Sequence, residues 1–425
     1  MKHSKFFFPN LIIAGMSLGT AWAIRGQFGH EQGAAWAGGL GVLAIVLLAG
    51  RADWYAKALK ATLAGAVGWG LGGMISYGVV VGYGRGSDFG NVYFGLMMLF
   101  VIGSLFGFLG GGMFGLVLDE TEEKPVVWPS LVTEMVAMAI LVYFFVVVQL
   151  GYLMTPPRSE MWAACLGLSV SLAWYLVRNG RTAPLRVAVY AGLGGGFGFA
   201  FGNFLQVLGI VSEIDFNFWN VMEYTIGFFG GASMAYGTFT AKWPQNTGAK
   251  AANRSWFPIS MLVLIIPLVV WDQSFGTERV QKMVAALDPA NVGMLTELTQ
   301  TLAFLAVVGA GMYWFYHFYL KNHPEVFTFK SLYPFFLAHF TLYTFSSWFI
   351  TGAFLSTYRI EQYLYLLNLL VIGFLIKKVK ADFRPMENRP QQWGMLLAVI
   401  FVVMAAAALV AISSHEVWER AAKRF

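Results

Sequence analysis

The side chains best suited to do chemistry lie in a polar turn between two apolar segments, Arg25-Gly26-Gln27-Phe28-Gly29-His30-Glu31-Gln32. Non-helical backbone at membrane depth survives only where protein or a water-filled cavity surrounds it. We therefore predict a binding turn, in which Arg25 holds an anionic or hydroxyl-rich group. Gln27 and His30 would add hydrogen bonds, and Glu31 would couple to a proton or cation. The alternative is a loop in the headgroup layer, with Arg25 extending to water.

A second carboxylate lies about one turn into another apolar segment, at Glu223 in Trp219-Asn220-Val221-Met222-Glu223. A carboxylate at that depth must be paired, protonated or in contact with water, because an isolated charge in hydrocarbon is costly. This position favours a role in proton or cation coupling. The alternative is a carboxylate that complements the positive end of a helix dipole.

Further polar residues stand at other turns, and we expect them to contribute to the same substrate site. The turn around Arg85 is rich in glycine, but it is not a phosphate loop, because no strand precedes it and the lysine–serine ending is missing. Arg85 could instead pair with Asp88. The substrate-binding residues predicted in addition to those of the first turn are Arg85, Asn91, Asn203, Gln206 and Asn220.

Aromatic and hydroxyl side chains gather between residues 313 and 351, where His339 and Tyr343 share a helix face by their spacing of four. Such a face would suit a flat polar solute, and the alternative is an aromatic belt at the membrane interface. The acidic residues at 119–123 are expected in a solvated loop. The chain has one cysteine, Cys165, and lacks the two-histidine spacing of a zinc helix. We expect neither a metal nor a cofactor.

The amino-acid composition indicates that membrane-spanning helices position these polar residues. Hydrophobic residues make up 58% of the 425 residues and charged residues 12%, whereas soluble domains carry about 25% charged residues. Apolar runs of roughly 20 residues, the length that spans a bilayer, recur along the chain. We predict an all-α polytopic membrane protein with about 13 spans, and an amphipathic surface helix within 274–292. The spans are 8–24, 33–50, 61–81, 91–118, 130–153, 161–177, 187–211, 219–240, 256–273, 293–320, 331–356, 360–376 and 391–412.

Basic residues in short loops predict the orientation. With the N-terminus inside, 19 of the 28 Lys and Arg residues fall in inner segments, six fall in outer loops and three lie in the C-terminal tail. We therefore expect an integral protein of the bacterial inner membrane with a cytoplasmic N-terminus. The basic residues are loop residues, so nucleic acid is not an expected partner.

Three helix pairs share a pattern that predicts an internal repeat. Each pair returns from its polar turn through a glycine pair: Gly38-Gly39, Gly110-Gly111 or Gly230-Gly231. Glu31 and Glu223 each precede their glycine pair by seven residues, so we take them as counterparts. For the same reason, the N-terminal run is interpreted as half of a repeat rather than as a removable signal. Two parallel six-helix halves, 1–177 and 178–380, would be followed by an extra helix and tail, 381–425.

These features lead to the hypothesis of a secondary active transporter for a small polar or anionic solute, surrounded by membrane lipids. Its cavity would open to the outside between the spans at 8–24, 33–50, 187–211 and 219–240. An alternative is an outer-leaflet enzyme, such as a transferase that uses a lipid-linked donor, with the first turn supplying an acid–base pair. A third possibility is a channel or an accessory subunit, whose glycine-rich helices would contact partner proteins.

Overall fold

The computed structural model describes residues 7–244, 256–321, 327–416, 418 and 421–425. These residues form helices and no strands. Ten helical segments are long and apolar enough to cross a membrane, which confirms an all-α membrane protein. Every predicted span coincides with a helical segment. However, the helices at three of them, α4 (Ala58–Gly72), α10 (Phe218–Thr240) and α15 (Phe329–Thr351), are not among those ten. The total of 13 crossings therefore stays a prediction.

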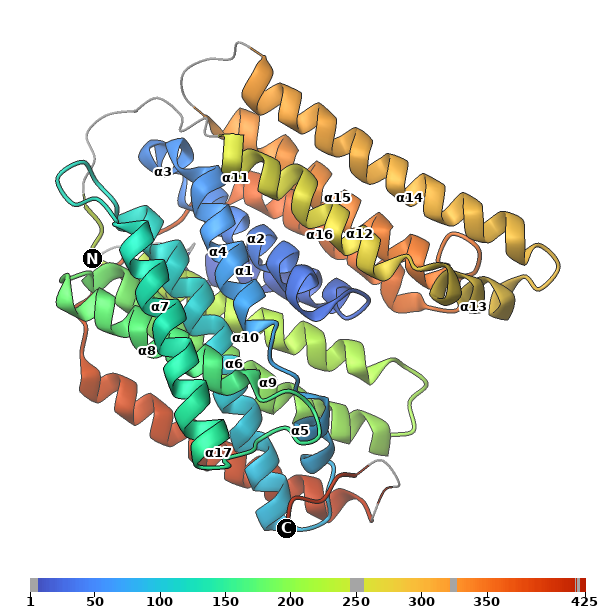
Figure 1. Cartoon of the computed structure of the whole chain (residues 1–425), viewed down its shortest axis with the longest axis horizontal. Helices are drawn as coiled ribbons and strands as arrows, with labels where there is room; N and C mark the ends of the chain where they lie inside the picture. Colours follow the sequence, from blue (N-terminus) through green and yellow to red (C-terminus); the bar gives the residue numbers. More distant parts are fainter. Residues whose placement is uncertain (1–6, 245–255, 322–326, 417, 419–420) are drawn as a thin grey trace.

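Six helices form a closed ring at the centre of the molecule (Figure 1). Around the ring, α1 packs on α2, α2 on α4, α4 on α6, α6 on α9, α9 on α10, and α10 returns to α1. Glycines allow these close contacts, because small residues let helix backbones approach one another. Besides α4 and α10, the ring consists of α1 (Phe7–Arg25), α2 (His30–Ala49), α6 (Phe89–Asp119) and α9 (Thr182–Val211).

The interior of the ring is filled by aromatic side chains centred on Trp69. A Cβ atom added at Gly38 would lie 2.5 Å from the Cβ of Trp69, and one at Gly230 would lie 2.9 Å from its Cη2. A Cβ at Gly110 would collide with the same indole. The first glycine of each glycine pair therefore faces one shared side chain. Trp22 packs against Trp69 with ring centroids 5.1 Å apart.

The second glycine of each pair faces the next helix of the ring. An added Cβ at Gly39 would contact α4, one at Gly111 would contact α9, and one at Gly231 would contact α1. The three helix pairs thus use their glycines in the same way. The ring also spans the predicted boundary between residues 177 and 178, because α9 and α10 close it. Whether the pairs are repeats of one ancestral unit stays a prediction.

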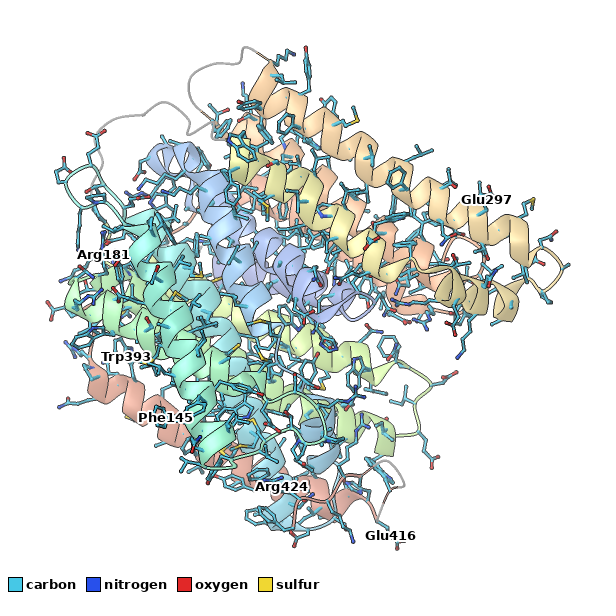
Figure 2. The ribbon with its side chains drawn as sticks, in the orientation of Figure 1. Phe145, Arg181, Glu297, Trp393, Glu416 and Arg424 are labelled. Carbon is cyan, nitrogen blue, oxygen red and sulfur yellow. The ribbon has the colours of Figure 1, made fainter. Side chains whose placement is uncertain are left out.

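Other helices surround the ring. On one side, α7 (Trp128–Tyr143), its extension η1 (Phe144–Gln149) and α8 (Met161–Arg178) pack on one another, and α17 (Pro390–Ser414) lies against α6 and α9. Side chains of these outer helices, such as Phe145, point away from the ring (Figure 2). Two short helices complete this part of the chain, α3 (Ala52–Ala56) and α5 (Gly78–Tyr83).

A second group of helices, which we call the lateral bundle, packs against α1, α2 and α4 on the other side. It includes the amphipathic helix predicted within 274–292, which is confirmed as α13: Val280 and Val284 are buried, whereas Glu278 and Lys282 are exposed. The lateral bundle comprises α15 with α11 (Trp256–Ser260), η2 (Met261–Ile265), α12 (Ile266–Ser274), α13 (Thr277–Leu287), α14 (Val292–Phe315), η3 (Tyr316–Leu320) and α16 (Ile360–Lys378).

The turns at 26–29, 84–88 and 212–217 lie on one face of the molecule, which we call the turn face: Gly26 approaches Glu223 near the start of α10, and Arg85 lines the same cavity as Glu213 and Asn217. Residues 421–425 of the tail lie on this face too, because Ala422 donates its N–H to the Gly82 carbonyl at 3.0 Å. Arg424 donates its N–H to Asn91 Oδ1 at 2.7 Å. The tail therefore lies at the end of the ring opposite to the start of α1.

Candidate functional site

A buried ion pair joins two helices of the ring at the turn face. Arg25 is the last residue of α1, and its Nη1 lies 3.4 Å from Oε2 of Glu223 in the first turns of α10. The two side chains are only 3% and 1% exposed. Glycine allows the approach, since a Cβ at Gly19 would lie 3.0 Å from a carbonyl oxygen of α10. Buried charges of this kind require a partner, and removing one partner is strongly destabilising.

Tyr77 completes the pair as a bridging hydroxyl. It donates a hydrogen bond to Glu223 Oε1 at 2.7 Å and accepts one from Arg25 Nη1 at 2.5 Å. Tyr77 lies between α4 and α5, so the cluster draws on three parts of the ring. The sequence offered no signal for Tyr77 beyond its place beside a polar turn. We call Arg25, Tyr77 and Glu223 the buried triad.

The buried triad leaves one strong donor unused. The Nε–H of Arg25 is buried and has no hydrogen-bond partner among the described residues. The Nη2 atom contacts Nδ1 of His30 at 2.8 Å, and His30 itself reaches the surface. A guanidinium prefers to be matched by a planar anion through two parallel hydrogen bonds. The Nε–H side of the Arg25 guanidinium is without such a match among the described residues.

Glu31 stands apart from this cluster. Its side chain is exposed, and no hydrogen bond or ion pair reaches its carboxylate from any residue in the described part of the chain. The backbone of Glu31 packs on α4, where a Cβ at Gly73 would lie 2.7 Å from the Glu31 Cα. Glu31 and Glu223 have the same spacing to their glycine pairs, yet only Glu223 faces Arg25.

The predicted binding residue Gln27 is held by the lateral bundle. Its carbonyl accepts a hydrogen bond from Arg279 Nη2 at 2.6 Å, and its Oε1 accepts one from Arg359 Nη1 at 3.3 Å. Arg279 belongs to α13, and Arg359 directly precedes α16. Neither arginine was selected from the sequence, because both lie in loops or surface helices where basic residues are common.

A cavity of about 750 Å³ opens on the turn face beside α9 and α10, and it is lined by Arg85, Gln206, Glu213 and Trp219 among others. Arg85 Nη2 donates to Gln206 Oε1 at 2.8 Å. Trp219 stands four residues before Glu223 on α10, so the two side chains share a helix face. The cavity therefore ends one side chain away from the buried triad. It is lined by α9, α10, the turn between them, Arg85 and Trp418 of the tail; α9 and α10 are two of the four spans between which the sequence predicts a cavity.

Two of the three predicted asparagines, Asn203 and Asn91, have structural partners at this face. Asn203 is buried and donates to the Val81 carbonyl at 3.4 Å. Asn91 donates to the Tyr83 and Ala422 carbonyls at 3.0 Å each and, through Oδ1, anchors the tail. These contacts hold the turn-face backbone around the cavity.

Asn220 leads to another buried carboxylate, which the sequence analysis missed. Its Nδ2 donates to Glu361 Oε1 at 3.3 Å, and its Oδ1 accepts from Tyr365 at 2.6 Å. Asn217 donates to the same Glu361 oxygen at 3.2 Å. Glu361 is 5% exposed and lies in the first turn of α16. The rule that identified Glu223, a carboxylate at the start of an apolar span, would have identified Glu361 as well.

The contact between the ring and the lateral bundle is polar at the turn face and aromatic below it. Tyr343 of α15 donates to the Gly33 carbonyl at 2.9 Å. Its ring stacks on Trp36 with centroids 4.6 Å apart. His339 lies one turn earlier in α15 and packs on Trp36 with ring centroids 5.2 Å apart. The predicted pairing of His339 and Tyr343 on one helix face is confirmed, and that face meets α2.

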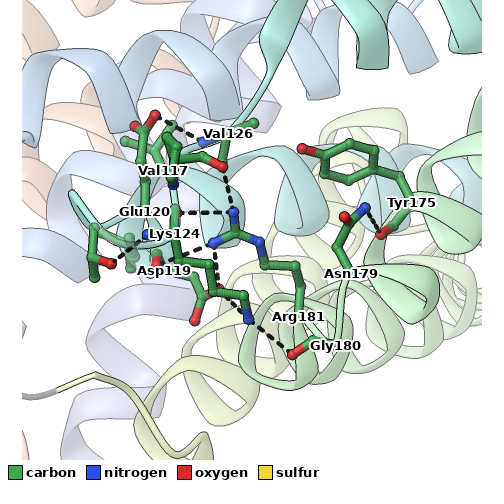
Figure 3. A network of polar contacts seen from close by, with 12 residues as sticks. Val117, Asp119, Glu120, Lys124, Val126, Tyr175, Asn179, Gly180 and Arg181 are labelled. Atoms are coloured by element: carbon green, nitrogen blue, oxygen red, sulfur yellow. Dashed lines mark hydrogen bonds and ion pairs between the residues drawn. The ribbon is translucent and has the colours of Figure 1, made fainter.

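A separate ion network on the opposite face holds a second buried arginine, Arg181, whose Nε–H also has no hydrogen-bond partner among the described residues (Figure 3). Arg181 Nη1 lies 3.0 Å from Asp119 Oδ2, and its Nη2 donates to the carbonyls of Lys124 and Pro125 at 2.9 and 2.8 Å. Asp119 is buried, so the expectation of a solvated position is wrong for this residue. Here most of the guanidinium is bound to backbone, which ties the end of α6 to the start of α9.

Comparison of the chain with protein-family models, with curated proteins and with solved structures gave no match. Within the described residues, no group of three or more His, Cys, Asp or Glu side chains is placed to hold a metal ion. The geometry of the buried triad is therefore the main guide to function.

Proposed function

We propose that the protein is a secondary active transporter that moves a small polar or anionic solute together with a proton, and that Glu223 carries the proton. The observation behind this proposal is the buried triad, in which a carboxylate and a guanidinium share one site and the guanidinium keeps an unused donor. Ionisable groups inside membranes are costly and mark solute or ion pathways.

The coupling follows from competition for Arg25. While Glu223 is ionised, it neutralises Arg25 and a second anion gains little by binding there. When a proton converts Glu223 to the neutral acid, the ion pair is lost and Arg25 is available for an anionic group of the solute. The solute is therefore held well only together with a proton, and the pair crosses as one unit. Each ligand shifts the equilibrium between transport states by its differential affinity for those states.

The element proposed to move is the lateral bundle. It meets the ring through a few polar contacts at the turn face, such as the hydrogen bond from Tyr365 to Asn220, and through stacked aromatic rings below. The ring is closed by glycine contacts and filled by Trp69, so it is suited to act as the fixed part. Rocking of one bundle against another is a common plan for transporters.

The predicted topology is kept as part of this proposal: 13 crossings, with the N-terminus in the cytoplasm and the turn face outside a bacterial inner membrane. It is supported by the tail, which lies at the turn face while α1 begins at the other end, as an odd number of crossings requires. The shared use of Gly38, Gly110 and Gly230 around Trp69 supports an internal repeat. The outer-leaflet enzyme receives no such support, since Arg25 is bound to Glu223 and Glu31 lies apart.

The test uses purified protein in liposomes with a pH-sensitive dye trapped inside. A panel of membrane-impermeant solutes is added outside: succinate, citrate, glutamate, phosphate and neutral sugars. We expect at least one anion to acidify the interior of liposomes that contain the wild-type protein. Glu223→Gln should abolish this acidification.

The matched control is Glu297→Gln, which removes a carboxylate from the surface of α14, far from the triad (Figure 2). This control should behave as the wild type does. If liposomes that contain Glu223→Gln acidified at the wild-type rate, Glu223 would not be the residue that couples transport to protons.

A further inference from the structure

Two arginines of the lateral bundle converge on one residue of the first polar turn. Arg279 donates to the Gln27 carbonyl and Arg359 to the Gln27 side-chain oxygen, at 2.6 and 3.3 Å. The other hydrogen bonds of these two guanidinium groups also go to uncharged acceptors. Arg279 donates to the Ser274 carbonyl at 3.5 Å, and Arg359 donates to the Tyr358 hydroxyl at 2.9 Å.

These two positive charges lack a carboxylate partner in the described part of the chain, where no ion pair includes either of them. The nearest acid in sequence to Arg359 is Glu361, which is turned inward to Asn217 and Asn220. Glu278, beside Arg279, is exposed. Partial burial, and then the charge of Arg359, lower the pKa of Arg279. The two like charges therefore repel each other, and an anion between them would relieve the repulsion.

The position of the arginine pair connects it to the buried triad. Gln27 follows Arg25 by two residues, and the polar turn carries the chain directly from one to the other. Arg279 and Arg359 both reach the surface, whereas Arg25 is buried. A negatively charged solute that reaches the turn face would thus meet the arginine pair before it meets Arg25. Charges of one sign at a mouth raise the local concentration of the opposite ion.

We propose that Arg279 and Arg359 form an anion-binding site at the turn face, which accepts a carboxylate or phosphate group. Guanidinium groups match the planar oxygens of these anions with paired hydrogen bonds. The assignment of the bound anion as the transported solute rests on the proposed function; anion binding itself does not. The same chemistry could come from a free solute or from the headgroup of an anionic lipid, and the experiment separates the two.

The experiment measures thermal unfolding of the full-length protein in a neutral detergent, with lipid removed. Inorganic phosphate and succinate are titrated at constant ionic strength, maintained with sodium chloride. In a second arm, short-chain phosphatidylglycerol is titrated instead. We expect phosphate or succinate to raise the unfolding temperature of the wild type. We also expect the apparent affinity to fall about tenfold in Arg279→Gln and in Arg359→Gln, the effect of losing one charge-assisted hydrogen bond.

Three further variants make the outcome specific. Lys282→Gln removes a positive charge from the exposed side of the same helix as Arg279, and it should keep the wild-type affinity. Arg279→Lys and Arg359→Lys keep the charge but lose the paired donors, so they should bind with intermediate affinity and show that the site still folds. Glu223→Gln should still bind anions at the mouth even where it no longer couples transport to protons.

The proposal is overturned if neither phosphate, succinate nor phosphatidylglycerol raises the unfolding temperature, or if Lys282→Gln weakens binding as much as Arg279→Gln does. A rise with phosphatidylglycerol alone would identify the bound anion as a lipid headgroup and would overturn its assignment as the transported solute. Failure of the proposed function has a different signature, since anion binding would persist in detergent while liposomes showed no proton movement.

Discussion

Arg25 and Glu223 are 198 residues apart in the chain, and their charged groups lie 3.4 Å apart inside the helix ring. This single relationship joins the end of α1 to the start of α10, and it places a pair of opposite charges in the buried interior of the ring. The stability of the ring and the proposed coupling both depend on it.

Breaking this pair from one side should cost more than removing both charges. We expect Glu223→Gln or Arg25→Gln alone to destabilise the protein by about 3 kcal/mol or more, because each leaves an unpaired buried charge or an unsatisfied partner. The double variant should recover part of that loss. Urea or thermal unfolding in detergent measures the difference. Additive losses in the double variant would show that the two side chains do not stabilise each other.

Tyr77→Phe removes only the bridging hydroxyl of the triad. Glu223 Oε1 then loses a hydrogen bond of 2.7 Å inside the protein, so we expect a loss of about 1–3 kcal/mol in the free energy of unfolding. Tyr343→Phe offers a comparison, since that hydroxyl binds a neutral carbonyl and should cost less. Equal losses in the two variants would argue against a special role for the triad.

The packing around Trp69 predicts which glycines are essential. Gly110→Ala and Gly38→Ala would push a Cβ into the indole, and overpacking of this kind costs about 1–3 kcal/mol. Gly309→Ala on α14 is the matched control, because nothing lies within 4 Å of its added Cβ and alanine is the better helix former. It should be neutral or slightly stabilising. Thermal unfolding of the three variants decides the matter, and a stabilising Gly110→Ala would contradict the packing described for the ring.

Topology can be measured with introduced cysteines, because the native Cys165 is buried. Lys423→Cys lies on the exposed tail at the turn face, and Asn179→Cys lies in the exposed turn between α8 and α9 on the opposite face. A membrane-impermeant maleimide added to intact cells should label the first and not the second. Labelling of both from the same side would require an even number of crossings between them.

Much of this architecture followed from the sequence alone. In a bilayer the backbone must satisfy its own hydrogen bonds, so each long apolar run has to become a helix. That is why every predicted span coincides with a helical segment and why charges such as Arg25 and Glu223 stood out. The glycine pairs were visible for the same reason, since small residues at fixed spacing indicate close helix contacts.

Only the tertiary structure decided which of those residues meet. The spacing to the glycine pairs made Glu31 and Glu223 equivalent, but the packing of α1 on α10 turns only Glu223 towards Arg25 and leaves Glu31 exposed. Tyr77, Glu361 and the arginines at Gln27 reach their places through contacts between helices distant in the chain. Periodicity within one segment records which side of that segment is apolar, and it holds no information about which distant segment will cover it. The sequence by itself determined which charged residues stand next to or within apolar segments, and the packing of the ring determined how they are paired.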